Sequence, residues 1–95
     1  MTINTRYYGA AVPSGHVYLL KQMSFYHETA GSRDIYVWLK SGGLEYPIFR
    51  AAAMPQYNMQ MPAGLSFAIP AGAQVGISSP LAVTAASVTI HGADL

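Results

Sequence analysis

Glycine and proline interrupt this sequence at short intervals, and that spacing most constrains what the chain can fold into. Apolar and aromatic residues fill the runs between them, and no run sustains the apolar period of an amphipathic helix. Runs rich in Val, Ile, Tyr and Phe and bounded by turn residues are typical of β-strands. We therefore expect strands and turns along the whole chain, with little helix.

The clearest strand is Ile35–Lys40, where β-branched and aromatic residues follow one another. Ser41–Gly43 predicts a tight hairpin turn, because consecutive glycines accept a positive φ at little cost. Leu44–Arg50 then pairs back antiparallel, and Pro47 indicates an edge position or a bulge since proline removes a ladder donor. The other predicted strands are His16–Glu28, Gln56–Met61, Leu65–Ile69, Gln74–Ser78 and Ser87–His91.

Two stretches need closer reading. Within His16–Glu28, strict alternation places Met23 and Phe25 on one side and Leu20 on the other. Ala51–Met54 admits a short helical turn, although the proline that follows would end it and favours a strand further on. Pro-Ala-Gly occurs twice, at Pro62–Gly64 and Pro70–Gly72, and each copy predicts a turn between strands. Proline presets φ at the start of the turn, and glycine supplies the position with positive φ.

These elements predict an all-β fold: one domain over residues 1–95, built as a single antiparallel β-sandwich or jelly roll of about eight short strands. Residues 1–11 precede the first strand and are expected to form an extended N-terminal arm onto a neighbour.

Composition narrows the function classes. Hydrophobic residues make up 52% and charged residues only 9%, against a usual charged share of about 25%, which excludes an intrinsically disordered chain. A net charge of +1 with scattered cations argues against nucleic acid as a partner. Zero cysteines exclude disulfides and thiolate metal sites. A small domain with so few charged residues must expose apolar side chains, which indicates that other chains cover part of its surface.

Targeting signals are not expected. The start, Met1–Arg6, has no apolar run behind a basic residue, so a signal peptide is not predicted. No apolar stretch approaches the roughly 20 residues of a membrane helix, so no membrane partner is expected. We expect a soluble protein made in the cytoplasm.

The sequence predicts no enzyme, with no catalytic, cofactor-binding or metal-ligating residues. His16, His27 and His91 lack metal-ligand spacing, and a site from His91 with Asp94 is a weak alternative. Ser14 beside His16 is typical of turn chemistry after a proline.

The acids are scattered along the chain. A glycosidase pair of Asp34 and Glu45 across the predicted hairpin is conceivable, but salt bridges to Arg33 or Lys40 are favoured.

Aromatic residues are dense on the predicted central strands, and methionines cluster after them. We interpret them as core or subunit interface, with a carbohydrate- or base-stacking platform as the alternative. The candidate interface residues are Tyr7, Tyr8, Tyr36, Trp38, Met54, Tyr57, Met59 and Met61.

Three motifs in order carry a resemblance to a known class. Val12–Leu20 reads x-P-x-G-x-x-Y-x-L, Ile69–Gly72 reads I-P-A-G, and Val88–Leu95 reads V-T-I-x-G-x-x-L. This order, from about Val12 to the C-terminus, resembles small all-β accessory proteins of tailed bacteriophage virions, including capsid cement (decoration) proteins and some tail-associated proteins. The stretch Ala51–Met61 departs from the pattern, being longer and richer in Met and Ala.

The resemblance implies a non-enzymatic structural protein on the outer capsid surface of the virion. Its expected partners are itself, as a homo-oligomer with a trimer favoured, and the phage major capsid protein, whose lattice it would stabilise. A tail, baseplate or head-tail module is the alternative, and a carbohydrate-binding β-sandwich is the second alternative.

Overall fold

The computed structural model describes residues 5–57 and 67–94, which form strands joined by turns, with no helix. The strands are β1 (Tyr7–Tyr8), β2 (Tyr18–Tyr26), β3 (Arg33–Ser41), β4 (Leu44–Met54), β5 (Phe67–Ile69), β6 (Gln74–Ser78) and β7 (Ser87–Asp94). The all-β prediction is therefore confirmed for the described part of the chain, which holds seven strands. The predicted strand Gln56–Met61 is not seen where it is described, because its first two residues lie in a turn.

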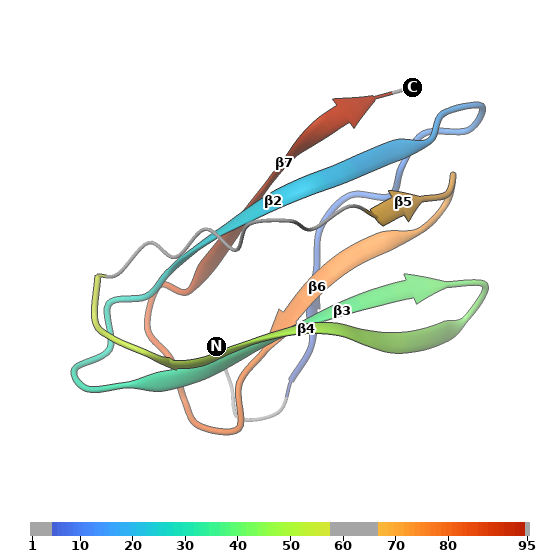
Figure 1. Cartoon of the computed structure of the whole chain (residues 1–95). Coiled ribbons are helices and arrows are strands. Elements are labelled where there is room, and N and C mark those ends of the chain that lie inside the picture. Colours follow the sequence, from blue (N-terminus) through green and yellow to red (C-terminus); the bar gives the residue numbers. More distant parts are fainter. Residues whose placement is uncertain (1–4, 58–66, 95) are drawn as a thin grey trace.

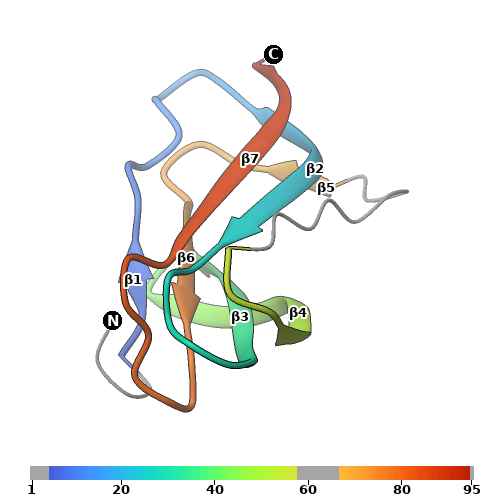
Figure 2. The same cartoon turned by 90° about the vertical axis from the view of Figure 1, so that its left-hand side faces the viewer.

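The strands form two antiparallel sheets packed face to face (Figures 1 and 2). One has four strands in the order β1-β6-β3-β4, and the other has three in the order β5-β2-β7. Apart from the β3–β4 hairpin, neighbours within a sheet are not consecutive in the chain, which passes repeatedly from one layer to the other. The core lies between the layers.

The β3–β4 hairpin follows the local sequence signals. Gly42 and Gly43 take positive φ values of 59° and 80° at the turn, as predicted. Pro47 lies on β4, an edge strand of the four-stranded sheet, at a register shift opposite Val37 and Trp38. Both expectations for that proline, an edge position and a bulge, are confirmed. The strand continues beyond its predicted end to Met54, so a helical turn in this stretch is wrong.

The alternation predicted for β2 is wrong at one point. Its pairing with β7 shifts register between Leu20 and Gln22, so Lys21 is an extra residue in the strand. The bulge brings Leu20 and Met23 to the same face, where both are fully buried. An insertion of one residue in a strand reverses which side chains point inward. A prediction that assumes strict alternation therefore fails beyond the insertion.

Both sheets and two connecting loops contribute to one apolar core. Phe25 of β2 and Phe49 of β4 stack across the layers with ring centroids 5.7 Å apart. The buried hydrophobic residues are Leu20, Met23, Phe25, Ile35, Val37, Leu39, Ala51, Met54, Ile69, Ala73, Ile77 and Val83.

The N-terminal segment lies along β6 of its own chain. Tyr7 and Tyr8 pair with Ile77 and Gly76, and beyond β1 the Gly9 amide donates to the Val75 carbonyl at 3.0 Å. Further on, the Val12 amide donates to the Ala73 carbonyl at 3.0 Å. The described part of the predicted arm is therefore an edge of this chain's own four-stranded sheet.

The second Pro-Ala-Gly turn is confirmed. Gly72 has a φ of 83°, and the Ala73 amide donates to the Pro70 carbonyl at 3.2 Å. The first copy, Pro62–Gly64, lies outside the described residues.

Candidate functional site

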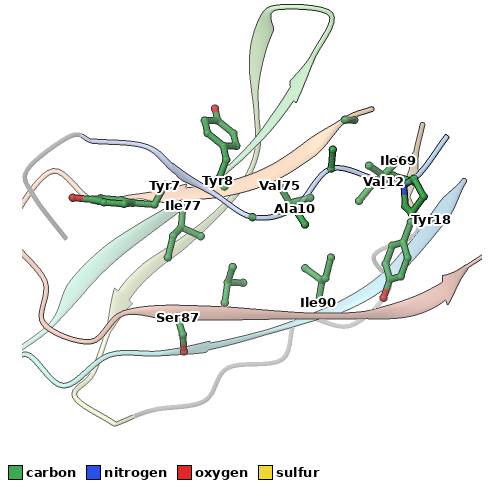
Figure 3. Close-up of a pocket in the computed structure, with 16 residues that line it drawn as sticks. Tyr7, Tyr8, Ala10, Val12, Tyr18, Ile69, Val75, Ile77, Ser87 and Ile90 are labelled. Atoms are coloured by element: carbon green, nitrogen blue, oxygen red, sulfur yellow. The ribbon is translucent and has the colours of Figure 1, made fainter. Parts of the chain in front are cut away.

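An apolar groove opens between the two sheets along the side where β1 and β7 lie (Figure 3). Its volume is about 520 Å³. Tyr7, Val75 and Ile77 line it from the four-stranded sheet, while Ser87 and Ile90 line it from β7. The other lining residues are Tyr8, Gly9, Ala10, Ala11, Val12, Pro13, Tyr18, Ile69, Ala73, Gly76 and Val88.

The groove arises because the two layers differ in width. The four-stranded sheet extends beyond β6 to β1, whereas the three-stranded sheet ends at β7. On the opposite side of the domain, the stacked rings of Phe25 and Phe49 fill the space between the layers. The space between the layers is thus open on the β1 side, where the groove lies.

The groove offers contact rather than chemistry. Among the described residues its lining carries no charged side chain. The side chains of Tyr8 and Ser87 point away from the groove, and the Tyr8 hydroxyl is bonded to Glu45 on the outer face of the sheet (Figure 3). A surface of this kind binds apolar groups by excluding water.

A second feature lies on the outer face of the four-stranded sheet, where aromatic rings alternate with charges. The Arg6 guanidinium stacks over the Trp38 ring, with its Cζ 3.6 Å from the ring centroid. The same guanidinium donates to Glu45 Oε2 at 2.8 Å. Lys40 Nζ lies 5.5 Å from the centroid of the Tyr8 ring. We call Arg6, Tyr8, Trp38, Lys40 and Glu45 the outer-face cluster.

Small residues of β6 make room for the outer-face cluster. Gly76 lies between Tyr8 on β1 and Trp38 on β3 in the strand register. A Cβ on this glycine would come within 2.5 Å of the Tyr8 ring, so the ring occupies the space a side chain would need. Two residues further along the strand, on the same face, Ser78 Oγ accepts a 2.8 Å hydrogen bond from Trp38 Nε1. These contacts fix the orientations of both rings.

The cluster perturbs two of its titratable groups. Partial burial, followed by the hydrogen bond to Glu45, raises the pKa of Tyr8 to about 12. In return, the Tyr8 hydroxyl and then the Arg6 charge lower the pKa of Glu45 below its ordinary value. Both shifts favour the protonation states that keep the bond: a neutral phenol and an ionised carboxylate.

A third group anchors the far end of the β3–β4 hairpin. Asp34 accepts hydrogen bonds of 2.7 Å from the Ala53 amide and from Arg50 Nη2. The hydrogen bond from the Ala53 amide, and next the one from the Arg50 guanidinium, lower the pKa of Asp34. Reciprocally, the hydrogen bond to Asp34 raises the pKa of Arg50. Arg50 Cζ also lies 5.5 Å from the centroid of the Tyr36 ring.

These contacts decide between the two interpretations of Asp34 and Glu45. Salt bridges are confirmed, but with Arg50 and Arg6 instead of the predicted partners. A glycosidase pair is wrong: Glu45 pairs with Lys40 in the hairpin register, and Lys40 lies about 20 Å from Asp34 at roughly 3.3 Å per strand residue. The carboxyl groups of such a pair must lie within about 10 Å.

The predicted interface residues separate into distinct groups. Tyr7 lines the groove, Tyr8 and Trp38 belong to the outer-face cluster, and Tyr36 lies on the same outer face. Tyr57 is 60% exposed and lies beside Tyr26, with ring centroids 6.0 Å apart.

The methionines of the predicted interface have a different outcome. Met54 is fully buried in the core, so its side chain is not presented to a partner. β4 extends further than predicted, and a register shift between Ala51 and Met54 brings both residues to the inward face. Met59 and Met61 lie outside the described residues.

The histidines have structural partners. His27 is fully buried: its Nε2 donates to the Met54 carbonyl at 2.7 Å and its Nδ1 accepts from the Thr29 amide at 3.2 Å. The His16 amide closes a turn by donating to the Pro13 carbonyl at 3.1 Å. Within the described residues, no three His, Asp or Glu side chains gather into a metal site.

Sequence reasoning missed one pair of catalytic residue types. Ser24 Oγ lies 3.0 Å from His91 Nε2 across β2 and β7. No signal within either strand could have found it, because the contact depends on the register in which β2 and β7, two segments distant in the chain, pair. A serine nucleophile needs its histidine oriented by a third group, and the described residues place no carboxylate on His91 Nδ1. Throughout this part of the chain, buried side-chain polar atoms all have hydrogen-bond partners.

The sequence predicts no membrane-spanning helix, and among the residues that the structure describes no helix is long and apolar enough to cross a membrane.

Comparison of the chain with protein-family models, curated proteins and solved structures gives no match. The groove and the outer-face cluster are the two candidate binding surfaces among the described residues.

Proposed function

We propose that this protein is a non-enzymatic virion structural protein, a capsid cement protein that oligomerises and binds the major capsid lattice of a tailed bacteriophage. The apolar groove supports this proposal most directly: a surface without charge suits protein contacts and has no group for catalysis. We also propose that the two packed sheets are a β-sandwich. The sequence resemblance supplies the phage context.

The energetics of a small domain favour such a role. A chain of 95 residues has limited core, and its stability is of the order of 10 kcal/mol. Burying on the order of 1,000 Å² of apolar surface per subunit, at about 25 cal/mol per Å², would supply about 25 kcal/mol before the entropic cost of association is subtracted, which exceeds that stability. Many copies that each bridge neighbouring capsid subunits would then stiffen the shell by multivalency.

The decisive experiment is co-sedimentation of the purified protein with capsids that lack decoration proteins. Saturation at a fixed ratio to the major capsid protein is the expected result, with bound capsids resisting heat or low salt better than bare ones. A protein that stays in the supernatant at every concentration would contradict the cement proposal. Labelling intact virions with an antibody separates the alternatives, since a tail or baseplate module would place the label at the tail.

Carbohydrate binding is retained as a second candidate because the outer-face cluster combines aromatic rings with hydrogen-bonding charges. Trp38 and Tyr8 lie near Glu45 and Lys40, the residue types that recognise sugar rings and hydroxyls. Arg6 already stacks on one face of the Trp38 ring, which limits the stacking area. Binding to a glycan array that is lost in Trp38→Ala would support this candidate, and an empty array would exclude it.

A further inference from the structure

Among the edge strands of the two described sheets, β7 lacks protection against a further strand. β1 and β5 are two and three residues long, and β4 carries Pro47, charged residues and register shifts. Short length, proline, charge and bulges are the devices by which edge strands avoid unwanted pairing. The segment Ser87–Ala93 of β7 contains no proline, lysine, arginine or acid.

The backbone of β7 is paired on one side only. It forms a ladder with β2, and no other strand of the described chain lies beside it. The backbone hydrogen bonds in turns and loops between described residues involve none of the amides and carbonyls of Ser87–Ala93. Unpaired backbone groups along a regular strand edge are the template on which an extended polypeptide adds as a new strand.

The apolar groove lies directly beside this free edge. Ile90 points from β7 into the groove, and Ile77 faces it from the other layer (Figure 3). Val88 lines the groove too, on the same face of β7 as Ile90 because side chains two residues apart in a strand share a face. Val75, Val88 and Ile90 are only partly buried. An occupant that covers them must therefore present apolar side chains and no charge.

The position beside β7 has room for a single strand. The four-stranded sheet extends past β6 to β1, whereas the three-stranded sheet stops at β7, so β1 lies across the groove from the vacant position (Figure 2). A second copy joined at β7 across a two-fold axis would bring its own four-stranded sheet to the side where β1 already lies, and the two would overlap. One extended segment, about 4.8 Å from β7, avoids that overlap and gives both layers four strands.

We propose that an extended segment of the major capsid protein adds antiparallel to β7 and fills the groove with every second side chain. The inference rests on the proposed cement function for the identity of the partner, whereas the site is defined by β7 and the groove. Apolar side chains of the segment lie opposite Val88 and Ile90, and polar ones lie opposite Thr89 and His91 on the outer side.

A strand matches both features of the site. Its backbone completes the free ladder of β7, and its apolar side chains exclude water from the groove. An alkyl ligand would cover the apolar lining but would leave the ladder unpaired. The two features together therefore favour a polypeptide over an apolar small molecule.

A strand supplied by the protein itself tests whether the site accepts one. An Asn-Gly turn and about nine further residues, appended after residue 95, allow the chain to fold back along β7. The complementary variant has Val at the positions opposite Val88 and Ile90 and Thr at the positions between them. The control variant exchanges Val and Thr, which directs the apolar side chains away from the groove. We expect the complementary variant to melt at least about 5 °C above the wild type, and the control to gain less than half as much.

A groove filled in this way should no longer bind capsids. In co-sedimentation with undecorated capsids, the complementary variant should bind at least about tenfold more weakly than the wild type. A variant with a Gly-Ser tail of equal length should bind like the wild type, since such a tail leaves the edge free. Val88→Lys, which places a charge in the apolar lining, should also weaken binding at least about tenfold. Thr89→Lys, at the exposed next position, is its matched control and should bind like the wild type.

Several results would overturn the proposal. One is equal stabilisation by the complementary and control extensions, and another is capsid binding by the complementary variant at the wild-type level. A wild-type oligomer that dissociates in the complementary variant would place a second copy in the groove instead. Binding of a fatty-acid probe, cis-parinaric acid, to the wild type without any stabilisation by the complementary strand would place an alkyl ligand there.

Failure of this proposal is distinguishable from failure of the cement function. If the wild type and the complementary variant saturate capsids equally, the strand site is refuted and the cement function stands. If the wild type ignores capsids while only the complementary extension stabilises the domain, the cement function and the capsid protein as the source of the strand are refuted. The site for an added strand beside β7 then stands.

Discussion

The Tyr8 hydroxyl donates a 2.6 Å hydrogen bond to Glu45 Oε1, which joins the N-terminal edge strand to the turn end of the β3–β4 hairpin. The two residues belong to strands that are separated in the sheet by β6 and β3. The bond therefore spans the outer face and ties together strands that share no backbone ladder.

This bond predicts a tyrosine that ionises late. Because the pKa of Tyr8 is raised to about 12 from 10.0, its neutral form is favoured by folding. The corresponding stabilisation is present below pH 10 and is lost as the pH rises through about 12. A tyrosinate absorbance titration should show a component near pH 12 that Tyr8→Phe removes. The same replacement at the exposed Tyr57 should leave that component in place, and its persistence in Tyr8→Phe would contradict the assignment.

Asp34 predicts the opposite dependence at acid pH. The Ala53 amide and Arg50 hold its pKa below the ordinary 3.8, so the stabilisation is present above that value and is lost as the pH falls through the lowered one. Asp34→Asn should lower stability near neutral pH by less than about 1 kcal/mol, since the site is partly exposed. Denaturant unfolding at pH 7 and in strong acid provides the measurement. A difference between variant and wild type that stays the same in strong acid would contradict the predicted role of the carboxylate.

The buried His27 predicts a larger loss. His27→Leu would leave unpartnered the Met54 carbonyl, whose bond joins the end of β2 to the end of β4, and the Thr29 amide, whose bond closes the local turn. We expect a loss of about 1–3 kcal/mol in the free energy of unfolding. His27→Gln is the matched variant because its amide offers both a donor and an acceptor, and it should retain part of the stability. Equal stability of His27→Leu and wild type would show that these bonds contribute nothing.

Gly92 lies where the backbone of β7 passes close to the backbone of β2. A Cβ there would collide with the Leu19 carbonyl oxygen where β7 passes the bulge of β2, and both atoms belong to backbone or are fixed to it. Gly92→Ala should therefore destabilise the domain by about 1–3 kcal/mol through overpacking. Gly9→Ala is the control, because its added Cβ would meet only the Val75 oxygen, at 3.8 Å. Thermal unfolding of the two variants distinguishes them, and equal melting temperatures would contradict the collision.

Features that depend on neighbouring residues could be predicted from the sequence. The glycine turn of the β3–β4 hairpin, the edge position of Pro47 and the turn at Pro70–Gly72 each follow from local backbone preferences. The all-β class follows from the same signals repeated along the chain.

Features that depend on residues distant in the chain could not be predicted from the sequence. The outer-face cluster needs Arg6 and Glu45 to meet, and nothing in either segment specifies the other. The Ser24–His91 contact depends on the register in which β2 pairs with β7, which neither strand specifies alone. The burial of Leu20 on the same face as Met23 depends on one extra residue in β2, which leaves no local signal that identifies it. The groove depends on unequal numbers of strands in two sheets, which is a property of topology and not of any segment.

The pairing of β2 with β7 has a consequence for the order of events during synthesis. β2 cannot pair with β7 until β7 has been synthesised, so the three-stranded sheet cannot be complete before then. In the same way, β1 cannot pair until β6 has been synthesised. Pairings between distant parts of a chain slow folding because loop closure precedes any gain from contacts. The β3–β4 hairpin joins neighbouring segments and can pair while the chain is still being made, whereas the three-stranded sheet can be completed only after β7 has emerged.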